Sequence, residues 1–262
     1  MRLHFLILFS MMICILLGFN NYRTKNSYFL LKSKEISFYT QDSVEIFGDL
    51  YEIDKKGKTI LLFHQGGSNA RGEYSPIIPR LIEQGYNVLA IDQRSGGQYY
   101  GSYNRTLAKI PTNIYGDGYE YCDAYNNLEG ALDFMIDNGF SGVKIVWGSS
   151  YSASLAIQLA NHRQGDVDGV LAFSPASGGS MKECLPDPYF ETLKQPLLLL
   201  RPPGEMQNEK SKLQFELAEK FKHQTYVPKS GVHGSSMLVE NRVGDDVQDT
   251  WKVVISFLEN VK

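Results

Sequence analysis

One serine in this sequence has a setting that could make it a nucleophile. Residues 144–147 form a short strand-like run, and a small-residue turn then leads directly into a helical pattern. A serine hydroxyl is a poor nucleophile unless a tight turn holds it beside a base. Such a turn strains the backbone, so the residues two before and two after the serine must be small. Gly148 and Ser152 meet this requirement around Ser150, although an ordinary strand-to-helix loop fits the same five residues equally well.

Short apolar strands alternate with amphipathic helices along the rest of the chain. Four continuous apolar runs are typical of strands buried on both faces of a parallel sheet, and they are Thr59–Phe63, Asn87–Ile91, Gly169–Phe173 and Pro196–Leu200. Helical patterns are found at residues 76–84, 128–135, 152–162, 213–221 and 247–258.

Two further segments complete this pattern. Residues 36–40 and 44–51 flank the turn Gln41–Ser43 and predict a β-hairpin, and Thr225–Val227 predicts a short last strand. Alternating strands and helices are the pattern of a parallel sheet that is covered on both faces. We therefore expect one α/β domain over residues 35–262, with a mostly parallel central sheet, helices on both faces and an N-terminal β-hairpin.

Two motifs in this framework resemble those of the α/β-hydrolase family. Residues 148–152 are similar to its G-x-S-x-G nucleophile turn, with Ser152 in place of the last glycine, and Asp92–Gly97 is similar to its Asp-x-Arg-Gly-x-Gly loop. The resemblance extends from about Ile36 to the end of the chain. It is greatest to compact dienelactone-hydrolase-like and serine-aminopeptidase-like esterases, because no long helical insertion follows Gly169–Phe173, where cap domains enter. It implies an α/β-hydrolase fold without a large cap and a triad in the order serine, acid, histidine.

The resemblance implies that the general base follows the last strand. His223 and His233 both lie well downstream of Ser150. His223 ends a helical stripe beside lysines, where a solvated or capping role is favoured. His233 lies in a glycine-flanked loop directly after the last strand, so it is the predicted base.

The implied acid belongs in the loop after Pro196–Leu200, which contains no aspartate. Glu205 is the first carboxylate after the strand and is the predicted acid. Glu209 is the alternative, although we expect it in the first turn of the next helix, where the helix dipole favours an acidic residue.

The resemblance also implies two backbone donors for the oxyanion of an acyl-transfer reaction. These are the N–H groups of Tyr151, directly after the nucleophile, and Gly66, in the loop after the first buried strand. Gln65 stands where many family members have glycine, so participation of its side-chain amide is open. A plain tight turn is the alternative reading of Gly66 and Gly67.

These residues together predict a serine hydrolase that cleaves carboxylic esters through an acyl-enzyme. A serine peptidase could use the same triad, and a non-catalytic α/β-hydrolase-fold protein could use the pocket for binding. The aromatic segment Tyr99–Tyr121 is a candidate rim for the substrate, but long surface loops often carry uninvolved tyrosines. The expected ligand is a small-molecule ester or a peptide.

Several other classes of function find no support in the sequence. The net charge is −3 and no long run of Lys and Arg occurs, so nucleic acid is not an expected partner. No His-Glu-x-x-His, Cys/His cluster, Walker or dinucleotide fingerprint is present. We therefore expect hydrolysis without a metal ion or cofactor.

The first residues of the chain predict export. An apolar stretch at residues 3–19 follows Arg2, so residues 1–20 form either a signal peptide or an uncleaved anchor with possible membrane attachment. Residues 21–34 are polar and predict a linker. The catalytic domain is expected outside the cytoplasm, either secreted, periplasmic or membrane-anchored.

Cys122 and Cys184 remain once this segment is set aside. An exported protein could join them in a disulfide, but two buried thiols fit the sequence as well.

Overall fold

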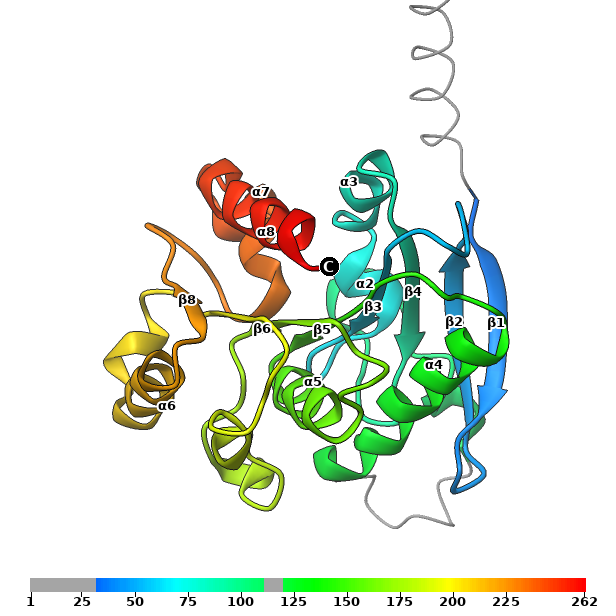
Figure 1. Cartoon of the computed structure of the whole chain (residues 1–262), viewed down its shortest axis with the longest axis horizontal. Helices are drawn as coiled ribbons and strands as arrows, with labels where there is room; N and C mark the ends of the chain where they lie inside the picture. Colours follow the sequence, from blue (N-terminus) through cyan, green and yellow to red (C-terminus); the bar gives the residue numbers. More distant parts are fainter. Residues whose placement is uncertain (1–31, 111–119) are drawn as a thin grey trace, which may run out of the picture.

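The structure is a computed structural model that describes residues 32–110 and 120–262. Its centre is one sheet of eight strands in the order β1-β2-β4-β3-β5-β6-β7-β8. The strands are β1 (Lys34–Tyr39), β2 (Glu45–Tyr51), β3 (Thr59–Phe63), β4 (Asn87–Asp92), β5 (Lys144–Ser149), β6 (Gly169–Phe173), β7 (Leu197–Leu200) and β8 (Gln224–Tyr226). Figure 1 shows the β1–β2 hairpin at one edge of this sheet and β8 toward the other.

The strand directions follow from the connections. The β1–β2 hairpin is antiparallel, and β2 also pairs antiparallel with β4. The neighbours from β4 to β8 are all parallel. The mostly parallel sheet and the N-terminal hairpin confirm the predicted fold class, and parallel strands bring their carboxyl ends to one edge of the sheet.

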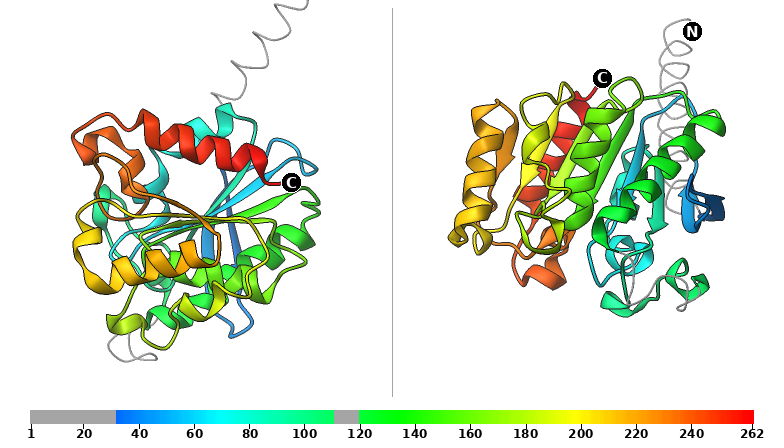
Figure 2. Two further views of the ribbon diagram at one scale, coloured as in Figure 1. Left: turned by 60° about the vertical axis from the view of Figure 1, so that its left-hand side comes forward. Right: turned by 90° about the horizontal axis from the view of Figure 1, so that it is seen from below.

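Helices cover both faces of the sheet (Figures 1 and 2). On one face lie α4 (Tyr125–Asp137), α5 (Tyr151–His162) and α6 (Glu209–Lys220). On the other lie α2 (Ala70–Tyr74), α3 (Ile78–Glu83) and α8 (Gln248–Asn260), with the short α7 (Glu240–Val243) leading into α8.

The apolar strands are buried because successive side chains point to opposite faces. In β3, Leu61 and Phe63 enter the core under α4 and α5, whereas Ile60 and Leu62 enter the core under α3 and α8. All four side chains are fully buried. This arrangement explains why the strand is apolar throughout rather than alternating.

The helix expected at residues 76–84 is shorter in the structure, and a separate helix precedes it. The Oδ1 atom of Asn69 accepts a hydrogen bond from Gly72 N–H (2.7 Å) and thereby caps α2. α2 ends before Pro76, and α3 begins at Ile78 with Pro79 in its first turn. Proline fits the first turn of a helix but not its interior, so the chain breaks into two helices there.

Cys122 and Cys184 form a disulfide, with their Cα atoms 5.7 Å apart. It joins the segment before α4 to the loop between β6 and β7. That loop contains only short 3₁₀ turns, Gly179–Met181 and Asp187–Tyr189, and no large cap domain.

The predicted export segment at residues 3–19 lies outside the described residues. In residues 32–110 and 120–262, no helix combines the length and apolar character needed to span a membrane.

Candidate active site

Ser150 lies at the sharp turn between β5 and α5. Its φ of 61° and ψ of −122° are outside the ordinary regions for a non-glycine residue. A Cβ atom on Gly148 would lie 2.3 Å from the carbonyl oxygen of Ser152, so only glycine fits there. Ser150 is partly exposed whereas Ser149 is fully buried. The turn thus has the strained geometry of a nucleophile elbow and presents Ser150 to the surface.

Ser152 has a use that glycine could not provide. Its hydroxyl donates to the carbonyl of Phe63 at the end of β3 (2.7 Å) and accepts from the N–H of Ser149 (3.0 Å). These bonds tie the turn to the neighbouring strand. The departure from the G-x-S-x-G pattern therefore keeps the residue small and adds a fixed point under the turn.

His233 and Glu205 are in direct contact. Nδ1 of His233 lies 2.6 Å from Oε1 of Glu205. An ionised carboxylate only accepts hydrogen bonds, so Nδ1 carries the proton and Nε2 is left as the basic nitrogen. Glu209, by contrast, is the exposed first residue of α6. Of the two carboxylates considered, only Glu205 contacts the histidine.

Arg201 holds Glu205 on the side away from the histidine. Its Nη1 donates to Oε2 of Glu205 at 2.7 Å, and the Arg201 side chain is 2% exposed. Burial would raise the pKa of Glu205, but the contacts with His233 and Arg201 outweigh it and hold the pKa below its ordinary value. The carboxylate is therefore ionised at neutral pH.

Ser150, Glu205 and His233 line one pocket of about 570 Å³. The loop after β6 and the first turn of α6 form its other walls. Among the described residues, Ser150 Oγ has no hydrogen bond to His233, a contact that often tightens only when substrate is bound. The other polar side chains in its lining are those of Ser174, Ser177, Arg201, Asn208, Lys210 and Ser211.

The two expected oxyanion donors are held by aromatic packing. The Tyr151 ring is buried, stacks on Tyr121 with ring centroids 4.6 Å apart, and donates its hydroxyl proton to the carbonyl of Ser95 (2.6 Å). A Cβ atom on Gly66 would lie 2.7 Å from the Tyr121 hydroxyl oxygen. In the described part of the chain, neither the Gly66 nor the Tyr151 N–H has a hydrogen-bond acceptor. Neither N–H is therefore committed to a partner within the described part of the protein.

The backbone N–H and the side chain of Gln65 both have partners within the protein. Its backbone N–H donates to Oε2 of Glu73 (2.7 Å), and its side-chain nitrogen lies 3.4 Å from the Tyr100 hydroxyl. Its backbone N–H is therefore occupied.

The Asp92–Gly97 loop connects neighbouring segments. The Asp92 carboxylate accepts from the N–H of Ala70 (2.8 Å) and from Nε of Arg105 (2.6 Å). Arg94 pairs with Asp42 in the turn of the hairpin. His64 is fully buried and neutral, because burial lowers its pKa, and its Nε2 accepts from the N–H of Gln93.

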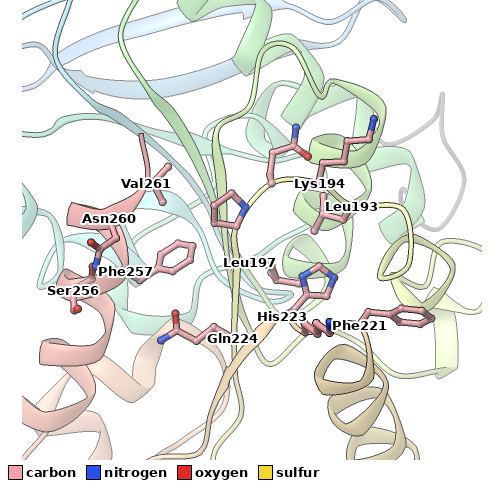
Figure 3. A pocket seen from close by; sticks show the side chains of 13 residues that line it. Leu193, Lys194, Leu197, Phe221, His223, Gln224, Ser256, Phe257, Asn260 and Val261 are labelled. Atoms are coloured by element: carbon pink, nitrogen blue, oxygen red, sulfur yellow. The ribbon is translucent and has the colours of Figure 1, made fainter.

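His223 lies away from this site. Its Nε2 is 2.7 Å from the carbonyl oxygen of Phe190. A pocket of about 460 Å³ surrounds it at the amino ends of β7 and β8, against α8 (Figure 3). Ser150 lies at the opposite, carboxyl edge of the sheet, so His223 cannot serve it.

Sequence reasoning missed two charged residues near the site, Arg201 and Glu73. Each is buried, but residue type gives no sign of burial, and Glu73 lies on a helix too short to show periodicity. In the described ranges, no group of three or more His, Cys, Asp or Glu side chains could hold a metal ion.

Solved structures with a similar fold come from several hydrolases. An esterase from Pyrococcus furiosus matches 89% of this chain and 92% of its own with a TM-score of 0.64 and 20% identity. A dienelactone hydrolase from Anabaena variabilis matches 88% of this chain and 99% of its own (TM-score 0.63, 14% identity). An acylaminoacyl peptidase from Pyrococcus horikoshii matches 88% of this chain and 42% of its own (TM-score 0.62, 13% identity).

No protein-family model and no curated protein sequence that was compared matches the chain. The strand order, the compact form and these structural likenesses show that the chain has the α/β-hydrolase fold.

Proposed function

We propose that this protein is a serine hydrolase that cleaves carboxylic esters, with Ser150 as nucleophile, His233 as general base and Glu205 as the acid. One observation carries the proposal: Glu205 fixes the proton on Nδ1 of His233, in a pocket that the strained Ser150 also lines. A solvated loop histidine has no need of a half-buried carboxylate held by a buried arginine. The esterase and dienelactone hydrolase likenesses agree with this reading.

The reaction needs only these side chains, the ester and water. The Ser150 oxygen attacks the carbonyl carbon while its proton passes to Nε2 of His233. Collapse of the tetrahedral intermediate breaks the bond to the alcohol oxygen, which leaves with that proton. Water then gives a proton to Nε2 and attacks the acyl carbon. Release of the carboxylic acid returns the proton to Ser150.

The Gly66 and Tyr151 N–H groups would stabilise the negative oxygen of each intermediate. Donors that are fixed before reaction stabilise the transition state without reorganisation, and one such donor typically contributes about 10²- to 10³-fold in rate. The packing of both residues against Tyr121 supports this role, because it limits movement of either backbone segment.

We infer that short esters with polar groups suit this pocket. Hydroxyl groups, an amide and the ammonium group of Lys210 line it, beside Pro175, Ala176 and three glycines. These polar side chains can form hydrogen bonds with polar groups of such a substrate.

The test is reaction with a fluorophosphonate probe, followed by mass spectrometry of the labelled peptide. The expected result is one adduct on Ser150, absent from Ser150→Ala, together with hydrolysis of p-nitrophenyl acetate. Failure of the folded wild-type protein to react would favour the non-catalytic binding protein. Faster cleavage of p-nitroanilides than of esters would favour a peptidase.

We propose further that the protein is exported. The apolar residues 3–19 and the Cys122–Cys184 disulfide support this, because disulfides persist in oxidising compartments. The intact mass of the exported protein would distinguish cleavage near residue 20 from an uncleaved anchor in the membrane fraction.

A further inference from the structure

A fully buried carboxyl group lies beneath the candidate active site and takes no part in the triad. Glu73, on α2, is 0% exposed. Its Oε2 accepts the backbone N–H of Gln65 at 2.7 Å. Its Oε1 is buried and has no well-formed hydrogen bond from the described residues, although the nearby Ser149 hydroxyl interacts with the carboxyl group and favours its ionised form. Burying a carboxyl group is unfavourable unless its oxygens accept hydrogen bonds. The burial of Glu73 with one oxygen poorly bonded therefore needs an explanation.

Glu73 is surrounded by the three loops that carry the site. Gln65 adjoins Gly66 in the oxyanion loop. The hydroxyl oxygen of Ser149, the residue before the nucleophile, accepts the N–H of Ser235 at 2.9 Å. A Cβ atom on Gly234, the residue after His233, would lie 2.3 Å from Ser149 Oγ and 2.7 Å from Gln65 Oε1. The three backbones therefore meet beneath the pocket.

The polar and charged groups that act on the Glu73 carboxyl come from several elements. Burial raises the pKa of Glu73 to about 7, while the Ser149 hydroxyl, the Gln65 N–H, Arg242 and His233 act in the opposite sense. Arg242 of α7 donates to the carbonyl oxygens of Glu73 and Gly72. The remaining titratable groups that interact with it are the hydroxyls of Tyr74, on the same helix, and Tyr151 of α5.

The bond from Gln65 has a consequence for the oxyanion loop. The carbonyl oxygen of Gln65 is held separately, by Nδ1 of His64 (2.9 Å) and by the N–H of Ser68 (3.2 Å). The N–H of Gly66 belongs to the same peptide unit as that carbonyl. Because Gly66 and Gly67 have no side chains to restrict their backbone angles, the orientation of the loop depends on how Gln65 is held. Glu73 binds the N–H of Gln65, on the opposite side of that residue from its carbonyl group.

We propose that Glu73 is a positioning residue for the oxyanion hole: by accepting the Gln65 N–H it fixes the peptide unit before Gln65, and thereby orients the next unit, whose Gly66 N–H receives the negative charge. This inference rests on the proposed hydrolase function. Glu73 touches no substrate and acts only through the backbone of the oxyanion loop.

The test compares two variants that are both uncharged and close to glutamate in length. Glu73→Gln keeps an oxygen that can accept the Gln65 N–H, whereas Glu73→Met keeps the buried volume but has no such acceptor. With p-nitrophenyl acetate, Glu73→Met should lower kcat by about 10- to 100-fold with KM within about twofold, since one oxyanion donor is misplaced. Glu73→Gln should recover most of that loss. Thermal unfolding of both variants serves as the control for folding.

A second readout isolates the oxyanion. A trifluoromethyl ketone forms a hemiketal with the nucleophile, and its oxyanion occupies the same site. Its affinity for Glu73→Met should fall by about the same factor as kcat/KM, as expected for a mimic of the transition state. A structural role alone would lower the amount of folded protein without changing the affinity of the folded fraction.

The outcomes separate this inference from the function on which it rests. An inert wild-type protein would remove the hydrolase function, and the role of Glu73 with it. If the wild type is active and the Met and Gln variants have equal kcat, only the role of Glu73 is overturned. If Glu73→Met does not fold, Glu73→Asp takes its place, because the shorter side chain draws the acceptor away from Gln65. Wild-type kcat in that variant would refute the proposal.

Discussion

Glu205 contacts His233 through one carboxylate oxygen and Arg201 through the other, so a single half-buried side chain links the exposed imidazole to a fixed positive charge. The His233 side chain is 52% exposed and that of Arg201 is 2% exposed. The arginine belongs to the end of the sheet and has little freedom to move. It therefore defines where the carboxylate sits, and the carboxylate defines the orientation of the histidine.

The first prediction concerns Glu205→Gln. The amide keeps the volume of the side chain but lacks the charge that stabilises the imidazolium formed during attack. We expect kcat to fall by roughly 10²- to 10⁴-fold, as for loss of a triad acid. Measurement of kcat for p-nitrophenyl acetate with the wild type and the variant checks this loss.

Glu209→Gln is the matched control. Glu209 is exposed at the start of α6, where its carboxylate only complements the helix dipole. Its replacement should lower the free energy of unfolding by about 0.3 to 1 kcal/mol with kcat close to that of the wild type. An exchange of phenotypes between the two variants would make Glu209 the acid and require the loop to rearrange in solution.

The second prediction tests which serine is the nucleophile. Ser150→Ala should lower kcat by about 10⁴-fold or more, as when a triad nucleophile is removed. Ser149→Ala should have a far smaller effect, because the Ser149 hydroxyl is buried and bonds to the N–H of Ser235. Ester hydrolysis by the two purified variants, with unfolding curves for each, gives the answer. Greater inactivation by Ser149→Ala would place the turn one residue earlier.

The sheet could be predicted from sequence because buried parallel strands are continuous apolar runs. The run at Gly169–Phe173 is a strand with those same ends. The strand predicted at Pro196–Leu200 begins one residue later in the structure, at Leu197. The contact between His233 and Glu205 joins the ends of two strands, and the family order of the triad indicated both loops. The catalytic roles remain predictions that the variants above test.

The short helix α2, the burial of Arg201 and the disulfide could not be predicted, because each depends on packing in the folded chain. α2 has five residues, too few for a hydrophobic period, so the helix that carries Glu73 was missed. Nothing in the sequence distinguishes Arg201 from an exposed arginine. The pairing of Cys122 with Cys184 depends on two loops that approach each other only in the folded chain.

The third prediction concerns that disulfide. It joins the segment of Tyr121, which packs on the oxyanion residues, to the loop that lines the pocket after β6. Cys122→Ser with Cys184→Ser should lower the free energy of unfolding by about 2 to 4 kcal/mol, because the unfolded chain is no longer cross-linked. We also expect a lower kcat, because two walls of the site are freed. Urea unfolding and ester hydrolysis measure the two effects, and unchanged values would mean that packing alone holds these loops.

The fourth prediction follows from the burial of Glu73 and concerns the pH dependence of stability. The pKa of this carboxyl is raised from 4.5 to about 7 in the folded chain. Between these pH values the folded state binds more protons at Glu73 than the unfolded state does, so the contribution of this group to stability falls as pH rises. The total fall is at most about 3 kcal/mol, reached above pH 7.

The variant Glu73→Gln has no carboxyl proton to lose in this pH range. The variant should therefore gain stability relative to the wild type from pH 5 to pH 8 in urea unfolding. Other groups, including Glu205, are common to both proteins and cancel in the difference. A difference that stays constant with pH would show that the folded Glu73 has its ordinary pKa, and that the buried site stabilises the carboxylate as well as water does.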